Sequence, residues 1–549
     1  MSTDASAGGP GLRWTSLVGA GLSARVAWRS RLLANTDSWQ RHTARLQVAQ
    51  LRGLLVEARG TEFGRACGFA RLAAIADDAE LLAAYRSAVP LADWHAFAPA
   101  IERMRLGAEP DVLWPGLVRH FAQTSGTTAG DKFIPVSDAM LRSNARSALD
   151  IFAYMRHRGL DLARLAAGRF LFLGGSSALS VSEAGIATGD LSGIVTPMIR
   201  WPISAIYSPG PEIALNSHWP SKIEAMARLA VDQDIRFISG MPSWALVLMG
   251  RVLELAAERG QRASCIRDVW PNLSIFVHGG VNYAPFASRI NAVVSGDAGV
   301  DLPHRLELYP ASEGFIAMQD VAGDPGLRLQ ADVGNFIEFV PLEAIDAAGA
   351  PAFAAHEVEF GQRYVVVLST CAGLYRYILG DVVEFDDIPA GLNGTGGTGP
   401  ARLRIVGRHR HFINAFGENI IVEHIERAVA AAAEQTGLAI GEFTAGPVYP
   451  APGRVAGLEL VLEAEADGEV ITRFGQAFDA ALKDQNVDYT TKRTGDLGMG
   501  PPTLSVVPPG SFHRWMASRG KLGGQHKCPR CANHRSIIEG VLETASAGT

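Results

Sequence analysis

The chain has 549 residues, of which 48% are hydrophobic and 19% charged, and its formal net charge is −6. This composition predicts a packed globular protein of about two to four structural units and excludes a largely disordered chain. The modest negative charge excludes a global basic field of the kind that recruits nucleic acid, so we expect no nucleic-acid partner. Any anion-binding site must therefore be local.

Cysteine usage and hydropathy predict a cytoplasmic protein. The five cysteines are few, odd in number and mostly far apart, which indicates a reducing compartment and no disulfide framework. No apolar run reaches about 18 residues, so we expect no membrane span. The first 35 residues carry arginines and one short apolar patch but no signal-peptide pattern.

The predicted elements alternate between helices and strands. Residues 36–100 are predicted to be helical, because their apolar positions recur at helical spacing. Short strand-like runs then follow, separated by helical stretches, at 169–175, 235–240, 273–280, 305–312, 336–342 and 363–370. Strands separated by helices predict largely parallel sheets, with ligands at the carboxyl ends of the strands.

The loop PAGLNGTGGTGP at 389–400 separates two predicted strands, and the chain changes character beyond it. An Ala/Glu-rich helix at 423–435, a strand pair and a lysine-containing C-terminal region follow. We therefore predict a large domain at 1–406 and a smaller domain at 407–549, with the boundary near Val406 to Arg408.

The segment TSGTTAGDK, Thr124 to Lys132, has the composition of a phosphate-binding loop. Small residues let backbone N–H groups surround an anion, hydroxyls add donors, and a lysine supplies positive charge. Only six of the 50 basic residues are lysines, and Lys132 is the only one in the first 221 positions. The segment does not fit a Walker loop, because Asp131 precedes the lysine and Phe133 follows it. The alternative is a Gly/Thr-rich surface turn.

Three later segments carry chemistry that suits a nucleotide. YPASEG, Tyr309 to Gly314, ends a predicted strand with an aromatic ring, a hydroxyl and a carboxylate suited to magnesium. GLYRYILGDVVEF, residues 373–385, places Gly380 and Asp381 at the mouth of a strand, where the carboxylate suits the hydroxyls of a ribose. GRHRHFINAFGENI, residues 407–420, has the glycine and cations of a hinge. Each segment alone also fits an ordinary turn or a solvated face.

The order and spacing of these segments resemble those of adenylate-forming enzymes, and within them the Gretchen Hagen-type acyl acid amido synthetases. The resemblance spans nearly the whole chain and includes TEFGRACGF, FAQTSGTTAGDKFIPVS, FVHGGVNY, YPASEGF, YRYILGDVVEF, DYTTKR and HKCPRC. It implies an α/β fold with a large N-terminal domain of mixed sheets flanked by helices, and a smaller mobile C-terminal α+β domain. The arginine-rich and alanine-rich composition suits a bacterial member of the family.

The resemblance implies a ligase that uses ATP and Mg²⁺. Such an enzyme adenylates a carboxylic acid and passes the acyl group to an amine, which we expect to belong to an amino acid, with release of AMP and pyrophosphate. Two alternatives stay open on the sequence: transfer to coenzyme A or a carrier thiol, and a nucleotide-binding protein that has lost catalysis. The expected partners are small molecules, and the sequence carries no signal for an oligomeric state.

Carried over position by position, the resemblance implies a set of nucleotide contacts. The ATP phosphates would be held by Thr124, Ser125, Gly126, Thr127, Thr128 and Lys132. The other contacts would be Gly279, Gly280 and Tyr309 at the adenine, Ser312 at the α-phosphate, and Asp381 at the ribose with Tyr375 and Arg376 beside it. Arg408 is a further expected nucleotide contact. Glu313 would bind the magnesium ion, and the catalytic groups would be Lys132, Glu313 and Lys527.

The resemblance also implies that the C-terminal domain supplies a lysine to the α-phosphate. The family pattern has a lysine after a glutamate where this chain has Glu418 and Asn419. Lys527 in QHKCPRC is the preferred substitute, and Lys492 is the runner-up.

Two further groups of residues could carry a function. Cys528 and Cys531, with histidines nearby, invite a zinc interpretation, but only half of a four-ligand site has the usual spacing. A pocket for the acyl group could draw on aromatic residues, although each also fits an ordinary core. These aromatic residues are Trp201, Tyr207, Phe237, Trp244 and Tyr283.

Overall fold

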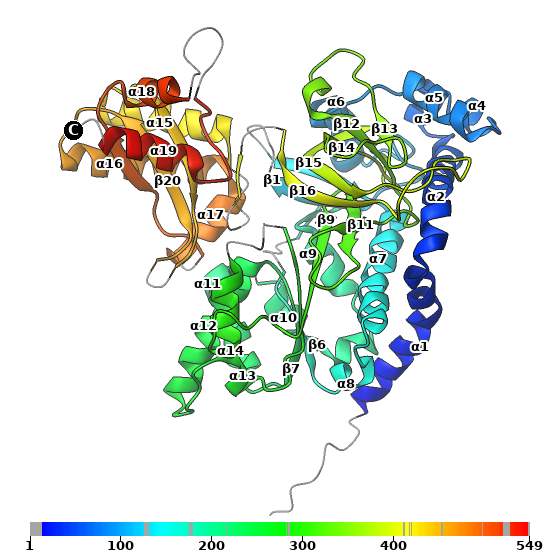
Figure 1. Cartoon of the computed structure of the whole chain (residues 1–549), viewed down its shortest axis with the longest axis horizontal. Coiled ribbons are helices and arrows are strands. Elements are labelled where there is room, and N and C mark those ends of the chain that lie inside the picture. The colour runs from blue at the N-terminus through cyan, green and yellow to red at the C-terminus, as the bar shows by residue number, and fades with distance from the viewer. Residues whose placement is uncertain are drawn as a thin grey trace, which may run out of the picture.

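The computed structural model describes residues 14–125, 131–174, 179–216, 218–280, 283, 286–409, 412–414, 416, 418, 420–451, 454–496, 498–519 and 528–546. Figure 1 shows a large body built from the earlier part of the chain, and beside it a smaller lobe built from the C-terminal part. No helix among these residues is long and apolar enough to cross a membrane. All five cysteines are free thiols.

Helices form the N-terminal part of the chain, as the apolar spacing predicts. They are α1 (Thr15–Ala34), α2 (Thr36–Ala58), α3 (Glu62–Ala66), α4 (Phe69–Ala73), α5 (Asp78–Ala88) and α6 (Trp94–Leu106). Asn35 caps α2 by accepting a hydrogen bond from Ser38 N at 2.9 Å. The apolar faces of α2, α4, α5 and α6 pack together in one buried hydrophobic cluster. Tyr377, the first residue of β15, belongs to the same cluster.

A four-stranded sheet carries the predicted phosphate loop. Its strand order is β2-β1-β5-β4, with β1 at His120–Ser125, β2 at Asp131–Val136, β4 at Ser180–Val181 and β5 at Ala187–Gly189. β1 and β2 form an antiparallel hairpin whose connection is residues 126–130. The parallel neighbour β5 pairs Gly189 with Ala122 of β1.

A twelve-stranded sheet forms the centre of the large body, in the order β13-β12-β14-β15-β16-β11-β10-β9-β8-β7-β3-β6. The bounds are β3 (Arg169–Phe172), β6 (Tyr207–Ser208), β7 (Ile235–Ser239), β8 (Ile275–Gly279), β9 (His304–Ala311), β10 (Gly314–Gln319), β11 (Leu327–Leu329), β12 (Phe336–Pro341), β13 (Phe353–Ala354), β14 (Arg363–Ser369), β15 (Tyr377–Asp387) and β16 (Arg402–Arg408). All six predicted strand runs are confirmed, as β3, β7, β8, β9, β12 and β14. The expected parallel arrangement holds only from β6 to β9, because later strands lack the helical crossovers that parallel pairing needs.

Helices cover both faces of the parallel half of this sheet. α7 (Asp138–His157) and α8 (Leu162–Ala166) pack with α1 on one face, where Phe170 of β3 stacks on Phe237 of β7 at 4.9 Å. The other face carries α11 (Trp219–Ala230), α12 (Pro242–Glu258), α13 (Ile266–Val269) and α14 (Ala287–Ser295). Two short helices, α9 (Leu191–Val195) and α10 (Pro211–Ala214), follow β5 and β6. Apolar side chains on both faces explain why these strands are continuous hydrophobic runs.

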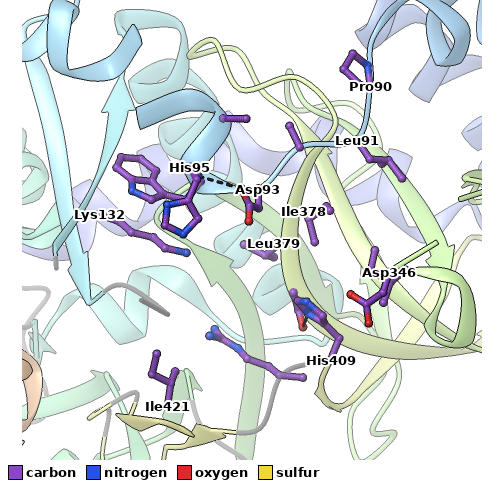
Figure 2. Close-up of a pocket in the computed structure, with 16 residues that line it drawn as sticks. Pro90, Leu91, Asp93, His95, Lys132, Asp346, Ile378, Leu379, His409 and Ile421 are labelled. Atoms are coloured by element: carbon purple, nitrogen blue, oxygen red, sulfur yellow. Dashed lines mark hydrogen bonds between the residues drawn. The ribbon is translucent and has the colours of Figure 1, made fainter. Parts of the chain in front are cut away.

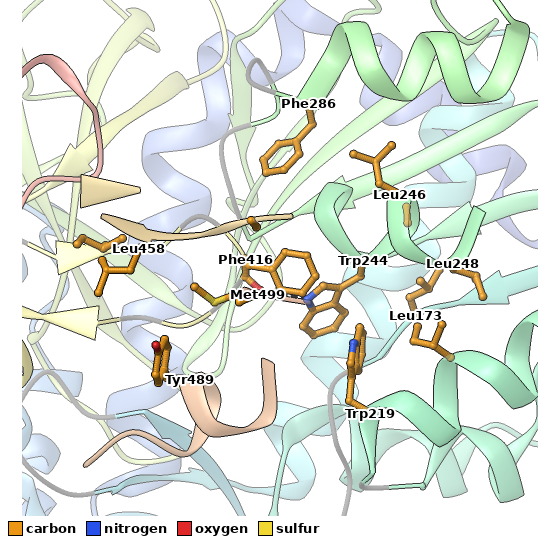
Figure 3. Close-up of a cluster of buried hydrophobic side chains, with 14 of the residues drawn as sticks. Leu173, Trp219, Trp244, Leu246, Leu248, Phe286, Phe416, Leu458, Tyr489 and Met499 are labelled. Carbon is orange, nitrogen blue, oxygen red and sulfur yellow. Dashed lines mark hydrogen bonds between the residues drawn. The ribbon is translucent and has the colours of Figure 1, made fainter. Parts of the chain in front are cut away.

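The C-terminal lobe is an α+β unit. Its elements are β17 (Phe412–Ile413), β18 (Ile420–Ile421), α15 (Val422–Thr436), β19 (Phe443–Val448), β20 (Gly457–Glu463), α16 (Gly468–Gln485), α17 (Val487–Arg493), β21 (Thr503–Val507), α18 (Ser511–Ser518) and α19 (Ser536–Ser546). β19, β20 and β21 make a three-stranded sheet. The predicted helix at 423–435 is confirmed as α15. A hydrophobic cluster joins the lobe to α11 and α12, and Figure 3 shows Phe416 beside Trp244 there.

Gly373 offers a test of the packing between the segment that follows α6 and the turn between β14 and β15. Its φ is 100°, and a Cβ on it would lie 2.7 Å from Leu113 Cβ and 2.9 Å from the Leu113 carbonyl carbon. We expect Gly373→Ala to destabilise the fold by about 2 kcal/mol or more, because it combines a strained φ with a backbone clash. Gly21→Ala in α1, where a Cβ meets nothing within 4 Å, is the control. Equal thermal midpoints for the two variants would contradict the argument.

Candidate functional site

Three side chains from different strands of the large sheet meet at one point. Tyr309 in β9 donates its hydroxyl to Asp381 Oδ2 at 2.7 Å, and Arg408 Nε in β16 donates to Asp381 Oδ1 at 2.6 Å. Burial and the nearby Asp381 charge raise the pKa of the Tyr309 hydroxyl well above its usual value, so it remains a donor. Two donors therefore fix the Asp381 carboxylate.

A β-bulge sets the position of Asp381. The register between β14 and β15 shifts between Val365 and Val367, and Gly380 in the bulged part of β15 has a φ of 97°. Glycine suits that φ because it has no Cβ. The prediction put Gly380 and Asp381 at the mouth of a strand, and the structure corrects this by placing them inside β15. Bulges commonly re-aim a side chain beside a functional site.

Glu313 is the buried acid of the cluster. It lies in the turn between β9 and β10, where it is 7% exposed and accepts a hydrogen bond from the Tyr377 hydroxyl. Burial raises the pKa of the Glu313 carboxyl, whereas the positive charges of Lys132 and Arg408 lower it. Two cations, one from each sheet, therefore favour the ionised form of the Glu313 carboxyl.

Lys132 brings its charge to this cluster from the four-stranded sheet. It lies in β2 opposite Thr124 of β1. The connection between these strands includes Gly126, Thr127 and Thr128, which lie outside the described residues. Ser125 ends β1, and its side chain is outside the description too. The structure therefore describes both ends of the predicted loop and places its lysine near Glu313.

A cavity of about 400 Å³ opens beside the cluster. Lys132 and Arg408 line it, together with apolar groups that include Leu91 and Ile378. Figure 2 shows Lys132 beneath His95 on one side of this cavity, and Ile421 of the C-terminal lobe below it. Apolar walls with a few convergent charges are typical of a small-molecule site of this size.

Sequence reasoning missed the wall that the start of α6 contributes to the cavity. Asp93 is the N-cap of α6 and accepts a hydrogen bond from His95 N at 3.0 Å. An aspartate before a helix is a general start signal, so nothing local marks it as part of a pocket. Ala92, two residues before α6, forms an isolated β-bridge with Tyr377 of β15. This bridge places the start of α6 beside the strand whose Tyr377 hydroxyl contacts Glu313.

The predicted adenine and α-phosphate residues lie at neighbouring strand ends. Gly279 ends β8 and pairs with Leu308, the residue before Tyr309. A Cβ on Gly279 would lie 2.4 Å from Leu308 O, and Gly280 follows with a φ of 84°. Ser312 is the first residue of the turn after β9. The structure therefore gathers these four residues at one end of β8 and β9.

Tyr375 and Arg376 lie elsewhere. The Tyr375 ring stacks on Phe63 at 4.9 Å, and its hydroxyl donates to Leu113 O at 3.0 Å. Arg376 Nε donates to Glu338 at 3.0 Å inside the fold. Neither residue lines the cavity. The polar groups of both residues are bonded within the core, and their place beside the nucleotide stays a prediction.

The two candidate C-terminal lysines have different outcomes. Lys527 lies outside the described residues. Lys492 is described in α17 and is 3% exposed. Its ammonium lies 4.4 Å from the ring centroid of Trp244 in α12 and 5.6 Å from that of Trp219 in α11. The runner-up lysine therefore contacts the large body directly.

The five aromatic residues suggested for an acyl pocket do not form one pocket. Trp201 is 76% exposed, while Phe237 packs with Phe170 on the α7 face of the sheet. Trp244 packs with α11 and the C-terminal lobe on the opposite face. Tyr207 lies 5.4 Å from Phe172, and Tyr283 stacks on His278 at 4.4 Å. That prediction is wrong as a single site, because sheet order separates the residues.

Within the described residues there is no group of three His, Cys, Asp or Glu side chains that could hold a metal ion. Cys528 and Cys531 are buried, and His526 lies outside the described part. The zinc alternative therefore finds no support in the described chain.

Models of one family match most of the chain in order. The model described as GH3 family N-terminal domain matches residues 32–209 and 186–298, the GH3 family central domain matches 329–391, and the GH3 family C-terminal domain matches 423–536. The matches cover the phosphate loop, the Gly380-Asp381 strand and α17. They run through both the large body and the C-terminal lobe.

Named relatives and solved structures align over nearly the full length. The chain is 25% identical to an indole-3-acetic acid-amido synthetase of Oryza sativa subsp. indica, over 98% of this chain and 96% of that protein. It is 24% identical to a jasmonoyl-L-amino acid synthetase of Nicotiana attenuata, over 94% and 97%.

Two solved structures share the fold. One is an acyl acid amido synthetase in complex with 2,4-DB, with a TM-score of 0.56 at 15% identity, covering 97% of each chain. The other is a 2-hydroxyisobutyryl-CoA ligase in complex with 2-HIB-AMP and CoA, with a TM-score of 0.54 at 15% identity, covering 92% of each. These likenesses confirm the predicted adenylate-forming fold.

Proposed function

The chain belongs to the GH3 family, and we propose that it is an ATP-dependent ligase that joins a carboxylic acid to the amine of an amino acid. The products are an amide, AMP and pyrophosphate. One observation carries the proposal: Lys132 and Arg408, from two separate motifs, line one cavity and both act on Glu313 from a third motif.

In this proposal the nucleotide lies across the ends of β8 and β9 and the bulge in β15. Asp381 accepts the ribose hydroxyls, since Tyr309 and Arg408 already hold its carboxylate in place. The glycine pair lines the adenine, Ser312 contacts the α-phosphate, and the loop from Thr124 to Lys132 surrounds the β- and γ-phosphates.

Glu313 fits a magnesium ion that arrives with ATP. Magnesium in nucleotide sites usually takes one or two carboxylates and completes its shell with phosphate oxygens and water, so a cluster of acids is not required. The charges of Lys132 and Arg408 favour the ionised form of Glu313 against the effect of burial. A magnesium ion held there would neutralise charge on the phosphate oxygens.

The chemistry has two halves. The substrate carboxylate attacks the α-phosphorus in line, the bond to the pyrophosphate oxygen breaks, and Lys132 and Arg408 stabilise the negative charge on the phosphates. The amine nitrogen then attacks the acyl carbon of the acyl-adenylate. The bond from that carbon to the AMP oxygen breaks, AMP leaves, and the amine loses a proton to solvent.

We further infer a hinge between the two predicted domains. β16 keeps Gly407 and Arg408 in the large sheet, where Arg408 pairs with Asp381. Because Arg408 is paired within the large sheet, we place the proposed domain boundary just after Arg408 rather than between residues 406 and 407. Rotation of a domain about such a hinge is a common way to separate two half-reactions. Cysteine usage and composition favour a cytoplasmic protein of bacterial source.

A substrate screen tests the proposed function. Aryl and fatty acids are offered with ATP, Mg²⁺ and single amino acids, and pyrophosphate release is measured. We expect release that depends on the acid, and a product with the mass of the amide. A thioester mass with coenzyme A, and no amide with any amine, would favour the thiol alternative. No acid-dependent release at all would favour a nucleotide-binding protein without catalysis.

A further inference from the structure

Two motifs of the site share one spacing of a tyrosine and an acid. In YPASE, Tyr309 is followed four residues later by Glu313. In YILGD, Tyr377 is followed four residues later by Asp381. All four side chains belong to residues that are only 1% to 8% exposed. The proposed chemistry uses Glu313 for the magnesium ion and Asp381 for the ribose, and it leaves the Tyr377 hydroxyl without a role.

The hydrogen bonds of these two motifs are crossed. The Tyr309 hydroxyl donates to Asp381 Oδ2 at 2.7 Å. The Tyr377 hydroxyl donates to the Glu313 carboxylate. Each tyrosine therefore bonds the acid of the other motif rather than its own. The strands β16, β11 and β10 separate β15 from β9 in the sheet, so backbone pairing does not set these contacts.

The two tyrosine rings are fixed in different parts of the core. Tyr377 belongs to the hydrophobic cluster of the N-terminal helices, where its ring centroid lies 6.1 Å from that of Phe97 in α6 and its backbone bridges to Ala92. Tyr309 belongs to a cluster that the strands of the large sheet bury. Close packing leaves a buried ring few alternative rotamers, so each hydroxyl is a fixed point for the carboxylate that it bonds.

A tyrosine orients an acid without neutralising it. Burial and the charge of Glu313 raise the pKa of the Tyr377 hydroxyl well above its usual value, so this hydroxyl stays a neutral donor. A carboxylate has about four acceptor positions on its two oxygens, so one tyrosine bond leaves positions for a ligand. The negative charge that a hard cation needs is also kept.

We propose that Tyr309 and Tyr377 are reciprocal positioning residues, each of which orients the functional carboxylate of the other motif. Tyr309 holds Asp381 for the ribose hydroxyls, and Tyr377 holds Glu313 for the magnesium ion. This rests on the proposed function, and it assigns the two hydroxyls to different parts of one nucleotide. Together they set the separation between the ribose and the metal-bound phosphates, which in-line attack on the α-phosphorus requires.

Tyr377→Phe and Tyr309→Phe test the proposal by removing one hydroxyl each, and Tyr489→Phe is the matched control. Tyr489 is also fully buried and donates its hydroxyl to an acid, Asp479, but it lies in the C-terminal lobe and does not line the cavity. ATP binding is measured by calorimetry without acid or amine, first over a range of Mg²⁺ concentrations and then with EDTA. The second probe is 2′,3′-dideoxy-ATP, because it lacks both ribose hydroxyls.

We expect Tyr377→Phe to raise the Mg²⁺ concentration for half-maximal ATP binding at least about fivefold, while ATP affinity in EDTA changes less than about twofold. Tyr309→Phe keeps the ring that is proposed to line the adenine. It should lower the preference for ATP over dideoxy-ATP at least about fivefold and leave the Mg²⁺ dependence within about twofold of the unsubstituted protein. Tyr489→Phe should lower the thermal midpoint by a similar amount and change neither property.

A purely structural role would not give this crossed pattern. If Tyr377→Phe lowers the thermal midpoint as the control does and leaves the Mg²⁺ dependence unchanged, Tyr377 does not position Glu313. If Tyr309→Phe keeps the full preference for ribose hydroxyls, the other half of the proposal is overturned. Tyr377→Phe added to Glu313→Gln should change the Mg²⁺ dependence no further, because the hydroxyl acts through that carboxylate. A further change would contradict the proposal as well.

Failure of the proposed function gives a different result. An unsubstituted protein that binds ATP with Mg²⁺, yet forms no amide with any acid and amine, would overturn the proposed function while the binding data still test the two tyrosines. An unsubstituted protein that forms an amide, with variants that lack the crossed pattern, would overturn the positioning roles alone.

Discussion

Lys132→Ala is expected to lower acid-dependent pyrophosphate release by about 10²- to 10³-fold, the usual cost of removing one group that stabilises transition-state charge. Lys132 lies in β2 at the end of the predicted phosphate loop, lines the cavity, and acts on buried Glu313. In the first half-reaction its charge offsets the charge that grows on the departing pyrophosphate. Pyrophosphate has left before the amine attacks, so the second half-reaction should be affected far less.

The two halves can be measured separately. Pyrophosphate release reports adenylation, and amide formation from a synthetic acyl-adenylate reports transfer to the amine. Lys132→Arg keeps the charge and should recover part of the first activity. The control is Lys483→Ala, a half-buried lysine on α16 that pairs with Asp479 in the C-terminal lobe. Equal losses in both halves would sink the assignment of Lys132 to the β- and γ-phosphates.

Motifs in which function and local structure coincide were predictable from the sequence. YPASEG ends β9 and forms the following turn as expected, because a strand-ending turn needs small residues and the carboxylate follows directly. Asp381 and Arg408 were also predicted, yet their contact was not. It arises because β15 and β16 pair in a register that sets these two residues opposite each other.

The rest of the site depends on contacts between distant segments. Tyr375 and Tyr377 are alike in sequence, but β15 begins at Tyr377, and Tyr375 lies before it among the N-terminal helices. The contact of Tyr377 with Glu313 therefore needs the strand boundary as well as the motif. Phe237 and Trp244 are separated in the same way, since one lies in β7 and the other begins the helix that covers the opposite face. Local patterns do not contain sheet order.

Glu313→Gln is expected to lower acid-dependent pyrophosphate release by about 10²- to 10³-fold, with the remaining activity less responsive to Mg²⁺. Glutamine has nearly the same size and can still accept a hydrogen bond from Tyr377, so the turn between β9 and β10 should keep its shape. What disappears is the negative charge that Lys132 and Arg408 both face. Two cations would then lie together without their shared acid.

The Glu313→Gln variant distinguishes a metal-binding role of Glu313 from a purely structural role. If Glu313 only balanced the two cations, the variant would lose thermal stability while its residual activity kept the same dependence on Mg²⁺ concentration. If it holds the ion, the Mg²⁺ concentration for half-maximal activity should rise several-fold at little cost in stability. Glu307→Gln is the control for a general effect of removing an acid. Glu307 lies in β9, the strand before this turn, and does not line the cavity. An unchanged Mg²⁺ dependence in Glu313→Gln would contradict the assignment, because the carboxylate is the part of this cluster that suits a hard cation.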